Sequence, residues 1–139
     1  MKLSYSSCLS FFVFFLSSVS FASDCTIFLS EENLCLDIAW IDGPKYNVYS
    51  KSIFTFWKKD DLKKTPTAPS KEIDIYPWMV MPGMEHGGRP VVLKNTSAGV
   101  YEVSKIYFAQ MTGHWEMRVR YVDTDRRTAA IAKINVELP

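Results

Sequence analysis

Apolar and polar residues alternate most regularly between residues 114 and 122. A period of two predicts a β-strand with one buried and one solvated face, as in an antiparallel sheet. No stretch from residue 23 to residue 139 shows a convincing helical repeat. The apolar side of the expected strand carries Trp115, Met117, Val119 and Tyr121, and the polar side carries His114, Glu116, Arg118 and Arg120.

Other extended segments recur at spacings of about ten residues, with turns or loops between them. They are rich in β-branched and aromatic residues, which suit a pleated sheet. Seven or eight short strands in roughly 115 residues predict an all-β fold, a single-domain immunoglobulin-like antiparallel β-sandwich. A charged, proline-bearing loop is expected at 58–71. Besides 114–122, the expected strands cover 26–29, 34–41, 52–57, 73–81, 90–94, 99–110 and 128–139.

The first residues have the pattern of a secretory signal peptide. Lys2 precedes an apolar run from Leu9 to Leu16, and small residues spaced for a signal peptidase end at Ala22. The signal peptide is therefore expected to cover 1–22, and one domain to cover 23–139. A membrane anchor would need about 20 apolar residues, and this run is shorter and broken by serines. The sequence predicts a periplasmic or otherwise secreted protein without a membrane span after cleavage.

Charge and cysteine content narrow the class of protein. The chain has 16 basic and 15 acidic residues, and removal of Lys2 with the signal peptide leaves 15 of each. This balance does not favour nucleic acid or an anionic membrane surface as a partner.

Cys25 and Cys35 remain after cleavage, and such a pair in an exported protein predicts a disulfide that stabilises the fold by about 2–3 kcal/mol. A thiolate metal pair is the less favoured alternative.

Methionine and histidine gather in two segments, WMVMPGMEHGG at 78–88 and MTGHWEM at 111–117. Thioether sulfur is soft and favours Cu(I), and imidazole suits copper as well. The glycines of the first segment allow unusual backbone dihedrals. If both segments share one end of the sandwich, their side chains can hold one ion, and a tryptophan face attracts cations. The candidate ligands are Met81, Met84, His86, Met111 and His114, and Trp78 is the candidate cation cover.

Ordinary structural roles compete with metal binding. Methionine is a flexible core filler, and the alternation in WMVM allows one pair of side chains to be buried. Met117 shares a face with Trp115 and is interpreted as core, and His114 lies on a polar face. The motif M-x-x-M-x-H fits many loops, so metal binding is a hypothesis from composition and compartment.

No catalytic motif is present. The sequence contains no G-x-S-x-G, no H-E-x-x-H and no glycine-rich phosphate loop before a helix. Glu85 and His86 are neighbours, and their side chains point apart in an extended chain. The chain is therefore not expected to be an enzyme.

Two segments, MPGMEHGGRPV and GVYEVSKIYFAQMTGHWEMRVRYVD, resemble the YtkA-like and FixH-like exported domains. The match covers about residues 73–123, and more loosely the N-terminal cysteines and tryptophan. The resemblance implies an immunoglobulin-like sandwich with a site at Met81, Met84 and His86, joined by Met111. FixH-like members are associated with copper supply to respiratory oxidases. This chain departs from the family at Glu85, where a glycine usually precedes the histidine, and in its expected lack of a membrane anchor.

Two functions follow from these patterns. The first is an exported protein that binds Cu(I) as a carrier or buffer and passes it to a metal-receiving or envelope protein. The second is a non-catalytic interaction module of a cell-envelope assembly that binds no metal, because aromatic residues and methionine are frequent in the cores of protein contacts.

Overall fold

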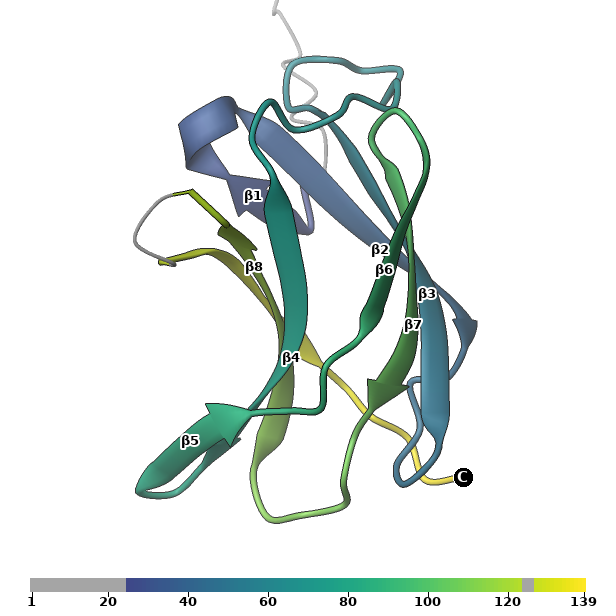
Figure 1. Cartoon of the computed structure of the whole chain (residues 1–139), viewed down its shortest axis with the longest axis vertical. Coiled ribbons are helices and arrows are strands. Elements are labelled where there is room, and N and C mark those ends of the chain that lie inside the picture. Colours follow the sequence, from purple (N-terminus) through teal and green to yellow (C-terminus); the bar gives the residue numbers. More distant parts are fainter. Residues whose placement is uncertain (1–24, 124–126) are drawn as a thin grey trace, which may run out of the picture.

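A computed structural model of the chain describes residues 25–123 and 127–139 (Figure 1). The expected signal peptide at 1–22 lies outside these ranges. Within them, no helix has the length and apolar character that crossing a membrane requires.

The described chain folds into nine strands and one short 3-10 helix, arranged as two antiparallel sheets. One sheet has the strand order β1-β2-β3-β7-β6, and the other has the order β5-β4-β8-β9. The sheets face each other (Figure 1), so the prediction of an all-β sandwich is confirmed, and the immunoglobulin-like strand order stays a prediction. The elements are β1 (Ile27–Leu29), η1 (Ser30–Glu32), β2 (Leu34–Asp42), β3 (Tyr49–Lys58), β4 (Ile73–Met81), β5 (Met84–Gly87), β6 (Val92–Ser97), β7 (Val100–Tyr107), β8 (His114–Tyr121) and β9 (Thr128–Ile134).

The core lies between the two sheets and follows the expected alternation. In β8 the residues at odd positions are buried and those at even positions are half-buried, which confirms the faces predicted for 114–121. β4 alternates in the same way from Ile73 onward. The facing sheet contributes aromatic and aliphatic side chains from β2, β3 and β7, including Leu36, Phe54, Phe56, Val103 and Ile106.

Proline at position 77 is compatible with β4 because of the side to which its backbone points. The Pro77 carbonyl accepts a hydrogen bond from the Gly88 amide, 2.8 Å, on the side of β4 away from β8. The nitrogen and carbonyl of one strand residue point to the same side, so the missing Pro77 N–H also faces away from β8. The β4–β8 ladder therefore loses no donor, although β4 lies between β5 and β8 and is not an edge strand.

The strand β5 (Met84–Gly87) was not predicted, since residues 78–88 were interpreted as a strand followed by a loop. The chain instead turns back after Met81 and pairs with the end of β4. All four β5 residues are exposed, so the segment has no buried and polar alternation by which a strand is recognised. The solvated loop expected at 58–71 is confirmed, because most of its residues are exposed.

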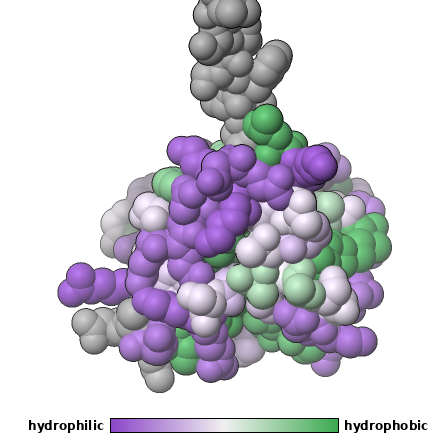
Figure 2. All heavy atoms as spheres, turned by 90° about the horizontal axis from the view of Figure 1, so that it is seen from above, coloured by the Kyte–Doolittle hydropathy of each residue, from purple (hydrophilic) through white to green (hydrophobic). Residues whose placement is uncertain are grey.

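The predicted disulfide between Cys25 and Cys35 is present, with the two Cα atoms 5.3 Å apart. Cys35 lies in β2 opposite Phe28 of β1, so the bond ties the N-terminal edge strand to its neighbour. β1 lies toward the end of the sandwich opposite β5 (Figure 1). Figure 2 views this opposite end from above, and hydrophilic side chains cover most of it, with only separate apolar patches between them.

Burial separates the methionines of the core from those of the candidate site. Met117 is 1% exposed and Met84 is 60% exposed. Met117→Ala is expected to lower the free energy of unfolding by about 2–5 kcal/mol, because it removes a buried side chain and leaves a cavity. Met84→Ala is expected to change it by no more than about 0.5 kcal/mol. Urea denaturation of both variants measures the difference, and equal destabilisation would contradict this assignment of the two residues.

Candidate metal-binding site

Two segments that are far apart in sequence meet at one end of the sandwich. β4 ends at Met81, β8 begins at His114, and Val80 pairs with His114. Because neighbouring antiparallel strands run in opposite directions, the end of β4 lies beside the start of β8. The β4–β5 turn and the segment 108–113 are therefore at the same end of the molecule (Figure 1). The two segments that carry the candidate ligands therefore lie at one end of the sandwich, which a shared site requires.

The segment 108–113 is held in place by an aromatic anchor. The Trp115 indole nitrogen donates a hydrogen bond to the Ala109 carbonyl, 3.0 Å. The Trp115 ring meets the Phe108 ring edge to face at 5.4 Å between centroids. The backbone amide of Gln110 donates a hydrogen bond to the side-chain oxygen of Asn47, 3.1 Å. These contacts fix the course of the segment that carries Met111.

Gly113 brings this segment against the end of β4. Its φ of +126° is disfavoured for residues with a side chain. A Cβ at this position would clash with the Val80 carbonyl oxygen and would lie 3.1 Å from its carbon and 3.2 Å from the Met81 Cα. Only glycine permits this close approach, which places Met111 near the β4–β5 hairpin.

The hairpin register puts three candidate ligands on one side of the sheet. His86 lies opposite Met79, and Met84 lies opposite Met81. Side chains of opposed residues share a face and have Cβ atoms about 4.5–5.5 Å apart. Met79 is fully buried, so this is the face that continues the core surface. Met81 is half-buried at the rim of the core, whereas Met84 and His86 are exposed.

A groove joins the hairpin to the second segment. It has a volume of about 310 Å³, and both His86 and Met111 line it. Met111 is 38% exposed, so its thioether is accessible from solvent. Met81 and Met84 line a separate groove at the hairpin tip, together with Val80 and Glu85. The hairpin register thus puts Met81, Met84 and His86 on one side of this end of the sandwich, and the groove shared with His86 brings Met111 to that side.

The imidazole of His86 is oriented by the backbone. Its Nδ1 lies 3.0 Å from the carbonyl oxygen of Gly87. A carbonyl oxygen only accepts hydrogen bonds, so Nδ1 carries the proton in this contact. The proton is then absent from Nε2 of the neutral ring, and Nε2 presents its lone pair for metal coordination. Histidine ligands are commonly oriented by such a bond from the other ring nitrogen.

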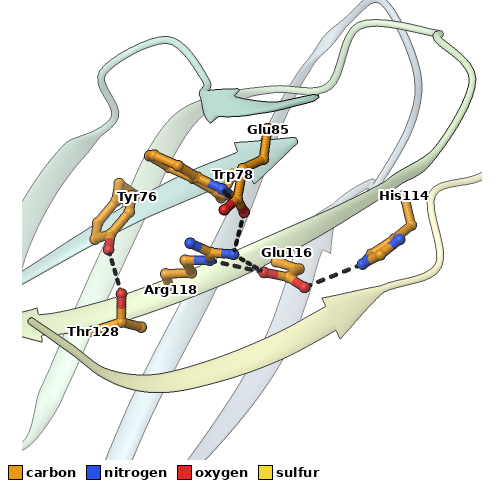
Figure 3. Close-up of polar contacts among 7 residues, drawn as sticks. All are labelled: Tyr76, Trp78, Glu85, His114, Glu116, Arg118 and Thr128. Atoms are coloured by element: carbon orange, nitrogen blue, oxygen red, sulfur yellow. Dashed lines mark hydrogen bonds and ion pairs between the residues drawn. The ribbon is translucent and has the colours of Figure 1, made fainter. Parts of the chain in front are cut away.

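The structure does not bring His114 and Trp78 to this side (Figure 3). His114 lies on the outer face of β8, and its Nε2 is 3.1 Å from Oε1 of Glu116. Trp78 lies on the outer face of β4. Its ring is covered by the Arg118 guanidinium, whose Cζ is 4.6 Å from the ring centroid. The indole therefore already has a cationic partner, on the side of the sheet away from the four grouped candidates.

An unpredicted network of charged and aromatic side chains occupies this outer face (Figure 3). The Arg118 Nε donates to Oε2 of Glu116 at 2.8 Å, and its Nη2 donates to Oε2 of Glu85 at 3.2 Å. The Trp78 indole nitrogen donates to the same Glu85 oxygen at 2.9 Å. The network depends on the registers of three strands, so the alternation within one strand did not reveal it.

The donor types available limit the metals that this end of the molecule can bind. Among residues 25–123 and 127–139, no group of three or more His, Cys, Asp or Glu side chains is suitably placed for a metal ion. Both cysteines of that part of the chain are consumed in the disulfide. The remaining set of three thioethers and one imidazole suits a soft ion such as Cu(I) and does not suit Ca²⁺ or Mg²⁺.

In comparisons with known proteins, no protein-family model matches the chain and no curated protein matches it significantly. The resemblance to YtkA-like and FixH-like domains therefore stays a prediction.

The outer-face network makes a prediction about pH. Hydrogen bonds from the Trp78 indole and from Arg118 lower the pKa of Glu85 from its ordinary value of 4.5. Because the pKa is lower in the folded chain, stabilisation by Glu85 is present above the ordinary pKa and is lost as pH falls through the folded-state value. The NMR resonance of the Trp78 indole N–H is expected to titrate with a midpoint below 4.5. The titration should disappear in Glu85→Gln, and a midpoint at or above the ordinary value would contradict these contacts.

Proposed function

We propose that this chain binds Cu(I) through Met81, Met84, His86 and Met111, and that it serves as an exported carrier or buffer of that ion. One observation carries the proposal. The β4–β5 register and the β4–β8 pairing put four soft donors on one side of one end of the sandwich. Three of these four candidates come from the hairpin, and the fourth comes from a segment about 25 residues later in the chain.

The donor set favours Cu(I) over harder ions. Thioethers are soft, neutral ligands, and unlike thiols they do not pair into disulfides in an oxidising compartment. Imidazole completes a set that adds no negative charge to the site. A site without anionic ligands has little electrostatic attraction for divalent ions, which supports selectivity for a soft monovalent ion.

The exposure of the ligands supports reversible delivery. Met84 is 60% exposed and Met111 is 38% exposed, so the ligands of a receiving protein can reach the ion without unfolding of the sandwich. A carrier transfers its ion through such an exchange of ligands, and no catalytic group is required.

The disulfide supports export. Bonds such as Cys25–Cys35 form and persist in oxidising compartments, including the bacterial periplasm and the extracellular space. The same compartment favours thioether over thiolate ligands. The expected signal peptide and the proposed donor set therefore agree with one localisation.

The alternative function, an interaction module without metal, uses the same hairpin. β5 is the terminal strand of its sheet among the described residues, and all its residues are exposed. A terminal strand offers backbone donors and acceptors to an added strand. This observation favours a protein contact, and metal binding by the isolated chain separates the two functions.

A Cu(I) titration of the mature chain tests the proposal. Ascorbate, under anaerobic conditions, keeps copper as Cu(I) and leaves the disulfide intact. We expect one ion per chain with a dissociation constant below about 1 µM. The double variant Met84→Ala/His86→Ala removes two of the four ligands, and we expect its affinity to fall by at least about tenfold, which corresponds to ~1.4 kcal/mol.

His114→Ala is the matched control, because it removes the other described histidine from the opposite side of the sheet. Its affinity for Cu(I) should equal that of the parent chain. If the parent chain binds no ion more tightly than about 1 µM, or if Met84→Ala/His86→Ala binds as well as the parent, the metal site is wrong and the interaction module is favoured.

A further inference from the structure

The hairpin strand that carries Met84 and His86 lacks the usual determinants of strand register. β5 has only four residues, and every one of them is exposed. A buried face normally fixes register, because a slip by one residue moves each side chain to the other face of the sheet. Every β5 side chain is exposed, so a slip by one residue would move no buried side chain into solvent. Burial therefore does not select the observed pairing of β5 with β4.

The turn is also not of the kind that aligns hairpin strands best. Pro82 and Gly83 are its two central residues, and Gly83 has φ of +74°. The preferred two-residue hairpin turns need a positive φ at the first central position, whereas the proline ring holds φ near −65°. The Met81–Met84 turn therefore belongs to a class whose twist matches the flanking strands poorly.

Glu85, the residue between the two candidate ligands, makes the side-chain contacts that the strand otherwise lacks (Figure 3). Its side chain lies on the outer face, opposite to Met84 and His86. One carboxylate oxygen accepts hydrogen bonds from the Trp78 indole at 2.9 Å and from Arg118 at 3.2 Å. Both donors come from longer strands, β4 and β8, so the contacts tie β5 to the centre of its sheet.

The two donors are themselves held in place. Arg118 is paired with Glu116 at 2.7 Å, and its guanidinium stacks on the Trp78 ring with 4.6 Å from Cζ to the centroid. Trp78 also meets the Tyr76 ring edge to face at 5.9 Å between centroids. Glu85 therefore binds to an already ordered pair of donors, which reduces the entropy lost when its contacts form.

We infer that Glu85 is a positioning residue of the metal site, which keeps Met84 and His86 on the opposite face by fixing its own side chain on Trp78 and Arg118. This inference rests on the proposed function. In a strand, neighbouring side chains point to opposite faces, so a fixed Glu85 determines the direction of both neighbours. A slip by one residue would place the carboxylate among the thioethers and turn both candidate ligands away from Met111.

The test uses the full mature chain and begins without metal. Backbone amide hydrogen exchange and the NMR contact between Met79 and His86 report on the hairpin register. In Glu85→Ala, we expect exchange of the β5 amides to become at least about tenfold faster and the contact to weaken. Glu85→Gln keeps an oxygen that accepts from the Trp78 indole, so it should retain most of the parent behaviour. The thermal unfolding midpoint should fall only slightly in both variants, because the contacts are exposed and lie outside the core.

Glu102→Ala is the control for loss of a surface ion pair, since Glu102 pairs with Lys51 at 2.9 Å on the other sheet. It should change neither readout. Cu(I) affinity is then measured on the same chains, and we expect Glu85→Ala to bind about tenfold more weakly and Glu85→Gln to fall between it and the parent.

The outcomes separate the positioning role from the metal site itself. Unchanged exchange in Glu85→Ala would overturn the positioning role, whatever the chain does with copper. Faster exchange with undiminished Cu(I) affinity would also overturn it, because the contacts would then be unnecessary for the site. A parent chain that binds no Cu(I) would refute the proposed function, and the exchange data would still decide whether Glu85 fixes the hairpin.

Discussion

The antiparallel pairing of β4 with β8 is the interaction on which the rest of this end of the molecule depends. It brings the turn after β4 beside the segment before β8, although about 30 residues separate them in sequence. It also assigns faces. Met79 and Trp115 point into the sandwich, and Val80 and His114 point out of it. The hairpin strand β5 then extends the same division into inner and outer sides.

The two sides of this sheet carry different chemistry. The inner side continues the apolar core outward into thioethers and one imidazole, and the Arg89 guanidinium lines the same groove as His86 and Met111, stacked on the Tyr107 ring. The outer side carries carboxylates, guanidinium groups and aromatic rings in a continuous set of contacts. Glu85 and its neighbours Met84 and His86 belong to opposite sides. The charged network thus supports the position of the hairpin without placing a carboxylate among the soft donors.

The sequence predicted the long strands because their alternation reflects burial. β8 shows a period of two since one of its faces is in the core, and β4 follows the same rule. β5 could not be predicted in this way because none of its residues is buried. The position of His114 on a polar face was correctly predicted from the alternation in β8. The alternation in WMVM separates Trp78 from Met79, but which of them faces inward became clear only from the pairing of β4 with β8.

The candidate ligands were identifiable as residue types but not as a group. Soft side chains near glycine and proline are visible in the sequence, whereas their common side depends on the hairpin register and on the close approach of Gly113 to β4.

X-ray absorption at the copper edge of the Cu(I)-loaded chain tests this grouping most directly. We predict a copper coordination sphere dominated by sulfur with one nitrogen ligand, and loss of that nitrogen in His86→Ala but not in His114→Ala. A shell of nitrogen and oxygen alone, or one that His86→Ala leaves unchanged, would contradict it.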